Sequence, residues 1–255
     1  MRQTCATVVS NKEILPNTYL MWIEASHIAT STKPGQFLMI QCGQKNEFLL
    51  RRPLSIHRVS KKQIAVLFNV VGQGTKWLST RCKKDKLNLL GPLGREFSIA
   101  PSSRSILLVG GGVGIAPLIF LAESAKNLGK SITLLLGAST GDVIYPYSLI
   151  PPGITYLPIT EDGSLGEKGM VTDFILEHQC NSDQVFACGP INMYRSMAAQ
   201  EELRIKAVQV SLEVRLGCGT GICYGCTIRT QHGLRQVCKD GPIFELQDVL
   251  WDELN

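Results

Sequence analysis

Four cysteines near the carboxyl end of the sequence constrain its structure more than any other feature. They are spaced Cys218-x4-Cys223-x2-Cys226-x11-Cys238, and C-x4-C-x2-C followed by a distant fourth cysteine is typical of the loop that binds a plant-type [2Fe–2S] cluster. Two bridged irons need two thiolates each, and small residues let the loop wrap one side of such a cluster. The small residues here are Gly217, Gly219, Thr220, Gly221 and Gly225. We therefore predict that the four cysteines bind a [2Fe–2S] cluster.

A structural zinc site in a binding module without enzymatic activity is the main alternative. Four-cysteine zinc sites usually have two short knuckles, each with a pair of cysteines two to four residues apart, whereas this sequence has one C-x2-C pair. Disulfides are a further alternative, although clustered cysteines in a reducing compartment indicate metal or redox chemistry. Among the other five cysteines, Cys188 is treated below, and the rest are expected to be mostly small core residues: Cys5, Cys42, Cys82 and Cys180.

The composition fits a globular protein without nucleic-acid or membrane functions. The chain has 255 residues, of which 44% are hydrophobic and 18% charged, enough for two domains or one large one with a buried core. The net charge of +5 is spread along the chain, so we expect no nucleic-acid binding. No signal peptide is visible, and no apolar run reaches the ~18 residues of a membrane span. We expect a soluble, cytoplasmic protein.

The first hundred residues read as short strands between turns. Runs rich in Val, Ile, Leu and Phe predict strands at 4–9, 19–25, 36–42, 53–59, 63–71 and 86–90, with a helix near 75–82. Short strands at this spacing favour a small antiparallel barrel. A linker at 100–103 follows, with the composition Ala-Pro-Ser-Ser.

After the linker, predicted strands alternate with helices. Strands are expected at 105–109, 132–136, 155–159, 184–187 and 208–211, with a helix at 116–128; such alternation implies a parallel sheet covered on both faces. Residues 212–255 have little regular pattern and need a metal to order them. The predicted fold class is a multidomain α+β protein: an antiparallel β-barrel domain (1–100), a parallel α/β domain (101–211) and a small [2Fe–2S] domain (212–255). The motifs described next assign FAD to the first of these and a nucleotide to the second.

Two motifs in the barrel region suggest the flavin. Arg51-Arg52-Pro53-Leu54-Ser55 opens a predicted strand; an arginine is a donor fork for anionic oxygen, the proline fixes an extended backbone, and Ser55 can hydrogen-bond a flavin ring edge. Gly72-Gln73-Gly74-Thr75 precedes a predicted helix, where free N–H groups favour a phosphate. Either motif alone also fits an ordinary strand start or turn. The prediction of a flavin site therefore depends on finding both motifs, in this order, within one small domain.

Two glycine motifs in the second region point to a nucleotide site. Gly110-Gly111-Gly112-Val113-Gly114 links a buried strand to a helix with Pro117 in its first turn. Its spacing departs from the Rossmann fingerprint, and no acid ends the second strand, so we predict a different nucleotide loop that includes Gly111, Gly112 and Gly114. Cys188-Gly189-Pro190 follows another strand at the ligand-binding edge of the sheet, and Cys188 is either beside the nicotinamide or simply a buried thiol.

In this order, RxPxS, GxGT, GGGxGxxP and CGP resemble the motifs of the ferredoxin–NADP reductase superfamily. More narrowly, nearly the whole chain resembles the electron-transfer subunits of NAD-dependent (class 1B) dihydroorotate dehydrogenase. The most specific parts of this likeness are the cysteine cluster with the Val237–Pro242 segment VCKDGP, and the stretch TEDGSLG at residues 160–166.

The resemblance implies that FAD binds between the first two domains. By matching motifs, Arg52, Pro53, Leu54 and Ser55 would contact the flavin. Leu67, Phe68 and Asn69 would follow its ribityl and phosphate end, and Gly74 with Thr75 would contact its pyrophosphate. Family members often carry a basic residue where this chain has Asn69, so some phosphate binding must come from elsewhere or FAD binds less tightly.

The resemblance also implies a partner and a direction for the chemistry. The partner would be an FMN-containing catalytic subunit that oxidises dihydroorotate to orotate in pyrimidine biosynthesis, assembled as a heterotetramer of two plus two. Electrons would pass from its FMN to the [2Fe–2S] cluster, then to FAD and to NAD(H), which is favoured over NADP because Ser139-Thr140-Gly141-Asp142 contains an acid and no base. Flavin/iron–sulfur subunits of sulfhydrogenases and ferredoxin-dependent transhydrogenases are the alternative.

Overall fold

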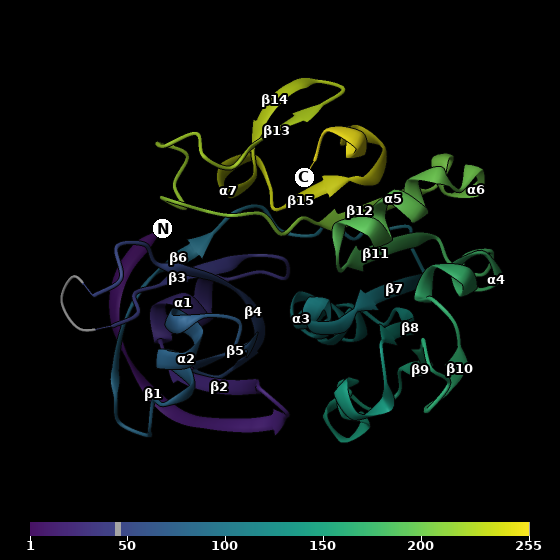
Figure 1. Cartoon of the computed structure of the whole chain (residues 1–255). Helices are drawn as coiled ribbons and strands as arrows, with labels where there is room; N and C mark the ends of the chain where they lie inside the picture. The colour runs from purple at the N-terminus through teal and green to yellow at the C-terminus, as the bar shows by residue number, and fades with distance from the viewer. Residues whose placement is uncertain (44–46, 255) are drawn as a thin grey trace.

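The first part of the chain is a closed antiparallel barrel of six strands, at the lower left of Figure 1. The computed structural model describes residues 1–43 and 47–254. The barrel strands, in the spatial order β1-β2-β5-β4-β3-β6, are β1 (Arg2–Leu15), β2 (Thr18–Glu24), β5 (Gln63–Asn69), β4 (Arg52–Ser60), β3 (Phe37–Ile40) and β6 (Lys86–Leu93). The predicted antiparallel barrel is therefore confirmed.

Alternating burial explains how these sequences close a barrel. Along β6, every second residue from Leu87 to Leu93 is buried and the residues between them are more exposed, so one face of the strand points into the barrel interior. Two short helices accompany the strands, α1 (Ser26–Ser31) and α2 (Gln73–Ser79). The sequence patterns did not indicate α1, and α2 begins and ends earlier than the predicted helix.

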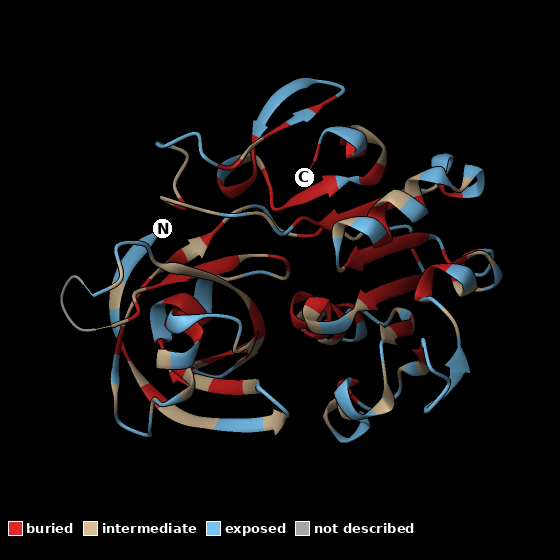
Figure 2. Ribbon diagram, in the orientation of Figure 1, coloured by how far each residue is buried: buried red, intermediate tan, exposed pale blue. Residues whose placement is uncertain are grey.

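The second part is a seven-stranded sheet with the order β10-β9-β8-β7-β11-β12-β15. All neighbouring strands are parallel except β15, which runs antiparallel to β12. The strands are β7 (Ser105–Gly111), β8 (Ser131–Ala138), β9 (Thr155–Thr160), β10 (Glu167–Lys168), β11 (Gln184–Cys188), β12 (Ala207–Ser211) and β15 (Ile243–Glu245). The predicted parallel sheet is confirmed, and its central strands form the buried core in Figure 2.

Short helices flank this sheet. The longest, α3 (Ile115–Asn127), follows a single 3-10 turn, η1 (Gly112–Gly114), and packs between the sheet and the barrel. The remaining helices are α4 (Ile175–Gln179), α5 (Ile191–Ala199) and α6 (Glu201–Arg204), with 3-10 turns η2 (Gly141–Val143), η3 (Tyr147–Leu149) and η4 (Val171–Phe174). No helix in residues 1–43 and 47–254 is long and apolar enough to cross a membrane.

The last part of the chain lies above both larger units in Figure 1. It contains a hairpin of β13 (Thr227–Thr230) and β14 (Gly233–Gln236), helix α7 (Val237–Asp240), strand β15, and the 3-10 turns η5 (Leu246–Asp248) and η6 (Trp251–Glu253). Because β15 completes the large sheet through Gln209–Glu245, Val210–Phe244 and Ser211–Ile243 pairing, this segment is joined to the second unit by backbone hydrogen bonds. The division at residue 212 stays a prediction.

The cysteines outside the cluster are less uniformly buried than their sequence context suggested. Cys42 and Cys188 are buried, whereas Cys5, Cys82 and Cys180 are exposed. The prediction that most of these thiols are core residues is wrong, since all three exposed ones lie in segments that face solvent.

Candidate functional site

A cavity of about 380 Å³ lies between the barrel, helix α3 and the chain that follows β12. Strands β4 and β5 form its barrel wall. Of the nine residues predicted to contact FAD, the cavity is lined by eight: Arg52, Pro53, Leu54, Ser55, Leu67, Phe68, Asn69 and Thr75. The fold thus brings together residues from Arg52 to Thr75, because β4 and β5 are neighbours in the barrel and α2 follows β5.

Adjacent arginines at the start of β4 point to different surroundings. Arg51 donates to the backbone oxygen of Asn88 at 3.1 Å and to its side-chain oxygen at 2.9 Å, so it ties β4 to β6. Arg52 instead lines the cavity, donates to the Leu50 carbonyl at 2.5 Å and lies over the Phe48 ring. Of the pair, Arg52 is therefore the one placed to meet an anionic ligand.

The ninth predicted residue, Gly74, lies behind Arg52. A Cβ at Gly74 would be 2.5 Å from Nε of Arg52, so a larger residue would displace the guanidinium. Thr75 organises the loop before α2, because its hydroxyl accepts hydrogen bonds from the amides of Val71 (3.0 Å) and Gly72 (3.2 Å). This loop forms one end of the cavity.

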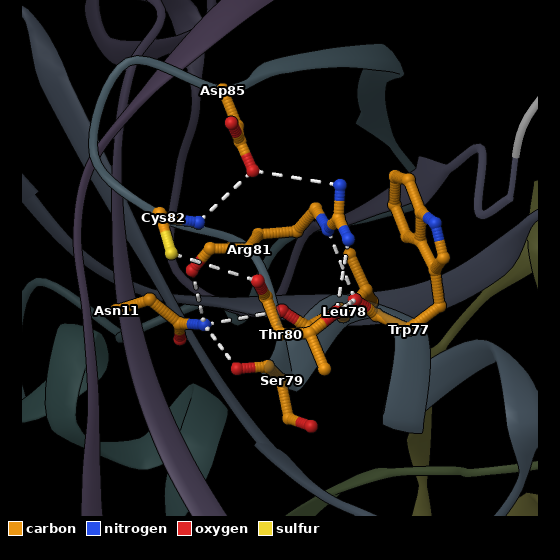
Figure 3. A network of polar contacts seen from close by, with 8 residues as sticks. All are labelled: Asn11, Trp77, Leu78, Ser79, Thr80, Arg81, Cys82 and Asp85. Carbon is orange, nitrogen blue, oxygen red and sulfur yellow. Dashed lines mark hydrogen bonds and ion pairs between the residues drawn. The ribbon is translucent and has the colours of Figure 1, made fainter.

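The opposite end of α2 is held by Asn11 of strand β1 (Figure 3). The Asn11 amide nitrogen donates to the carbonyls of Leu78 (3.1 Å), Ser79 (3.0 Å) and Arg81 (3.0 Å), which lie at or just after the end of the helix. Asn11 thereby anchors the element that carries Thr75 to the barrel.

Asn69 has a structural partner in addition to its place in the cavity wall. Its side-chain oxygen accepts a hydrogen bond from the Thr18 hydroxyl at 2.9 Å. Among the described lining residues, Arg52 is the one lysine or arginine. Arg52 is therefore the one cationic side chain that this part of the wall offers to an anionic ligand.

A second cavity, of about 710 Å³, lies at the carboxyl edge of the large sheet. Its walls come from the loops after β7, β8, β9 and β11. Five residues predicted to bind the nucleotide line it: Gly111, Gly112, Gly114, Gly189 and Pro190. A Cβ at Gly114 would collide with the Cys188 carbonyl, so the glycine allows the loops after β7 and β11 to approach each other closely.

Cys188 is fully buried behind the wall of this cavity rather than on its surface. Its Sγ is 3.9 Å from Oε1 of Glu213. Burial, followed by the charge of Glu213, raises the pKa of the Cys188 thiol well above its usual value. The thiol is therefore neutral at physiological pH, and it contacts the site through Glu213.

Glu213 is a site residue that the sequence patterns did not reveal. Together with Val113 it lines both cavities, so it lies where they meet. The residue is exposed at this junction, and desolvation by the neighbouring protein raises the pKa of its carboxyl above the ordinary value. The one signal in the sequence was its place just after the apolar strand 208–211, at the same edge of the sheet as Cys188.

The four cluster cysteines occupy a loop whose amides point at sulfur. The amides of Thr220 (3.4 Å) and Ile222 (3.3 Å) donate to Sγ of Cys218, and the Gly221 amide donates to Sγ of Cys238 at 3.2 Å. Left-handed backbone at Gly219 (φ 74°) and Gly221 (φ 84°) turns these amides inward. Such N–H···S contacts favour thiolates and hence metal binding.

The thiols interact in two pairs, Cys218 with Cys223 and Cys226 with Cys238. The first pair faces outward and the second is buried. Burial opposes ionisation of Cys218, but the amide of Thr220 and the contacts with Cys223 lower its pKa to about 5. Burial and the neighbouring Cys226 raise the pKa of Cys238 to about 12. An inner and an outer pair suit a binuclear metal group with two thiolates for each metal.

Within the described parts of the chain, no three cysteine, histidine or acidic side chains converge as ligands of one metal ion. The cluster loop also packs on the barrel, since a Cβ at Gly219 would be 2.6 Å from Met39 of β3. Leu216, Val237 and Pro242, which flank the cysteines in the sequence, line the first cavity. The cysteine loop and the first cavity therefore share a wall.

A barrel with a flavin-type cavity beside a parallel sheet is the architecture of the ferredoxin–NADP reductases. The solved structure of an NADH-dependent reduced ferredoxin–NADP oxidoreductase, described for flavin-based electron bifurcation, matches with a TM-score of 0.89. It is 31% identical, and the match covers 98% of this chain and 91% of that chain. The protein is thus a reductase of this fold with a cysteine-rich loop.

Sequence comparison narrows the class to one family. Residues 213–250 match the iron–sulfur cluster binding domain of dihydroorotate dehydrogenase B. The electron transfer subunit of NAD(+)-dependent dihydroorotate dehydrogenase B from Desulforamulus reducens is 36% identical over 97% of this chain and 98% of its own length, and that from Bacillus cereus is 36% identical over 98% and 99%. The chain belongs to this family of electron transfer subunits.

Proposed function

We propose that this chain carries electrons between a partner's FMN and NAD through a [2Fe–2S] cluster and FAD, as part of an enzyme that oxidises dihydroorotate to orotate. One observation carries the proposal: the segment after β12 connects all three sites. Ser211 lines the first cavity, Glu213 lines both cavities, and Cys218 belongs to the cysteine loop. Three redox groups bound at these places would be neighbours.

Each group has residues that fit it. The first cavity suits FAD, with Arg52–Ser55 and Leu67–Asn69 along the flavin and Gly74 with Thr75 at the pyrophosphate. The second suits NAD(H), held by the two glycine loops, with Cys188 behind them. When bound, the flavin exchanges a hydride with the nicotinamide and single electrons with the cluster. The chain itself supplies position, charge and protection from water. Residues 1–100, 101–211 and 212–255 would bind FAD, NAD and the cluster.

The [2Fe–2S] assignment is supported by the cysteine spacing and by the paired thiols. The visible spectrum of the protein purified without oxygen, before and after NADH, tests it together with FAD. Flavin bands with a broad iron–sulfur shoulder, all bleached by NADH, are expected. A flavin spectrum without the shoulder, with one equivalent of zinc in the metal analysis, would contradict the cluster and leave a simple flavin reductase.

Exposed apolar side chains beside the outer cysteines support an FMN-containing partner. Ile222 and Tyr224 flank Cys223 and are 79% and 70% exposed, and Leu234 on the neighbouring hairpin is 64% exposed. An apolar patch around a redox group is suited to a protein interface that brings two redox groups together. The proposed assembly is a cytoplasmic heterotetramer of two subunits of each kind, since free thiols and a cluster suit a reducing compartment.

Co-expression with the catalytic subunit tests the partner. The wild-type pair is expected to co-purify as a two-plus-two complex by light scattering, and Tyr224→Ser is expected to weaken it at least tenfold. Lys12→Ala on the far side of the barrel serves as a control. Equal co-purification of the Tyr224 and Lys12 variants would exclude this patch as the interface.

A ferredoxin-dependent transhydrogenase subunit is the second candidate, because the bifurcating oxidoreductase matches nearly the full chain with a TM-score of 0.89. The purified complex distinguishes the two. Reduction of NAD by dihydroorotate supports the first function. Reduction of NADP by reduced ferredoxin and NADH, without activity on dihydroorotate, supports the second.

A further inference from the structure

A histidine of the barrel forms a contact between the two larger units. None of the sequence motifs pointed to this residue. His57 lies on β4 and its side chain is fully buried. Its Nδ1 is 2.8 Å from the backbone oxygen of Ala116 in α3, and its Nε2 is 2.9 Å from the hydroxyl of Tyr145, which follows β8. One side chain of the barrel thus contacts two elements of the nucleotide-binding unit.

The chemistry of the partners fixes the roles of the two ring nitrogens. A carbonyl oxygen can only accept, so Nδ1 carries the hydrogen and donates to Ala116. Nε2 of the neutral ring then accepts from the Tyr145 hydroxyl. The two rings also meet edge to face, with centroids 5.5 Å apart and planes at 68°. Hydrogen bonds depend on both distance and angle, whereas apolar packing depends little on angle. These contacts therefore define both the distance and the orientation of α3 relative to β4.

The place of this contact in the chain connects the two cavities. His57 is two residues after Ser55, which lines the first cavity, and Ala116 is two residues after Gly114, which lines the second. Ala116 itself also lines the first cavity. A displacement of α3 along β4 would therefore move the glycine loop of one cavity relative to the wall of the other.

A second contact flanks His57 and shows that the interface is a broad one. Arg58 pairs with Glu123 of α3 at 3.3 Å and donates to the Leu149 carbonyl. This pair is partly exposed, so solvent screens it. His57 is fully buried, and burying an imidazole is unfavourable unless both nitrogens are paired. An apolar side chain could fill the same space without needing hydrogen-bond partners. The presence of a histidine here therefore indicates that its two hydrogen bonds have a role of their own.

We propose that His57 is a positioning residue that sets the separation between the flavin site and the nicotinamide site by holding α3 against β4. The proposal rests on the proposed function for the identity of the two ligands. The geometry that carries it, the His57–Ala116 and His57–Tyr145 contacts, belongs to the chain alone.

Three substitutions distinguish a loss of the position of α3 from a general loss of stability. His57→Leu keeps most of the volume and removes both hydrogen bonds, whereas Tyr145→Phe removes the hydroxyl alone. His57→Asn places an amide N–H near the position of Nδ1, and so restores part of the contact with Ala116. Ile23→Val, in the fully buried core of the barrel, is the control for a general loss of stability.

The first readout is amide hydrogen exchange of residues 112–118 in the full chain, which needs no turnover. His57→Leu is expected to accelerate exchange there at least tenfold, Tyr145→Phe less, and Ile23→Val not at all. The second readout is the single-turnover rate of flavin reduction by NADH, with FAD content measured alongside. His57→Leu is expected to lower this rate at least tenfold at unchanged FAD occupancy, and His57→Asn to recover part of it.

Unchanged exchange at residues 112–118 in His57→Leu would overturn the proposal. So would equal losses of rate in His57→Leu and Ile23→Val, because the effect would then reflect stability alone. A wild-type flavin that NADH does not reduce would instead contradict the proposed function, and the exchange data would still decide whether His57 holds α3 in place.

Discussion

At the scale of single residues, the site depends on a few polar groups whose surroundings set their charge. Glu213 is the clearest case, since it lies where the two cavities meet and desolvation by the surrounding protein raises the pKa of its carboxyl. Loss of hydride leaves a positive charge on a nicotinamide, and a nearby carboxylate stabilises that charge. The ionised form of Glu213 therefore favours oxidation of the nucleotide.

Glu213→Gln should lower the rate constant of flavin reduction by NADH roughly tenfold, which corresponds to about 1.4 kcal/mol. Protonation removes the charge in the wild type, so its rate should fall as pH drops through a carboxyl pKa above the ordinary 4.5, and the variant should lack this limb. Stopped-flow measurements between pH 5 and 8 check both points. Glu161 lines the second cavity but not the first, so Glu161→Gln should keep the limb. Loss of the limb in both variants would contradict this role.

His57 predicts a pH dependence of stability. Burial, opposed by the Ala116 carbonyl and reinforced by the charge of Arg58, lowers its pKa from 6.5 to about 3. The unfolded chain therefore binds a proton below pH 6.5 that the folded chain does not, and stability falls as pH falls through this window. The loss between pH 7 and pH 5 is about 2 kcal/mol.

Urea unfolding of the wild type and His57→Asn at pH 7, 6 and 5 measures this contribution. Tyr145, Arg58 and Glu123 surround the ring and are the same in both proteins, so the difference between their pH profiles isolates His57. We expect the variant to lose about 2 kcal/mol less stability over this range. Parallel profiles would contradict this prediction, because they would show that the folded protein protonates His57 as readily as the unfolded chain does.

At the scale of elements, Asn11 holds the loop that carries Thr75. Asn11→Ala removes the three hydrogen bonds to the carbonyls at the end of α2, of which the Leu78 carbonyl keeps the Arg81 amide as a partner, and should lower the free energy of unfolding by about 1 to 2 kcal/mol. FAD affinity should fall as well, because α2 positions one end of the first cavity. Urea unfolding and FAD titration measure the two effects, with the exposed Lys12→Ala as the neighbouring control. A stability loss at unchanged FAD affinity would mean that the loop does not depend on α2.

Elements were predictable where the local pattern and the tertiary environment agree. The barrel strands and the strand–helix alternation follow from apolar runs, and the glycine loops from their sequence. Strand β1 extends to Leu15 beyond its apolar part, because pairing with β2 holds the polar stretch around Asn11. Strand β15 was missed because its three residues are ordered by pairing with β12. Glu213 was missed because the two cavities that it lines are formed only by the folded chain.

At the scale of the whole molecule, the last segment and the nucleotide-binding unit form one packed body. Trp251 is buried, stacks near Tyr194 with ring centroids 5.0 Å apart, and donates to the Leu246 carbonyl at 2.8 Å. The Tyr194 hydroxyl in turn donates to Ser211 at 2.7 Å and accepts from the amide of Gly189 at 2.9 Å. Packing near the carboxyl end is thereby linked to the wall of the second cavity.

Trp251→Ala should lower the free energy of unfolding by about 3 to 5 kcal/mol and weaken NADH binding. Thermal unfolding of residues 101–254 should remain a single transition. Calorimetry and nucleotide titration measure these effects. Trp77→Ala, which removes a partly exposed ring over Arg81 on the barrel, should cost less and leave NADH binding unchanged. A separate early transition of the cysteine-rich segment in the wild type would contradict a single packed body.

The segment from Ser211 to Cys218 has a further consequence, for how this chain can change over evolutionary time. Within eight residues it passes the first cavity, the junction of the two cavities and the first of the four clustered cysteines. An inserted or deleted residue there would alter every spacing between the redox groups at once. Homologous sequences should therefore vary in length at exposed turns such as the one around Gly153 and keep one length between Ser211 and Cys218, a contrast that an alignment of the family can check.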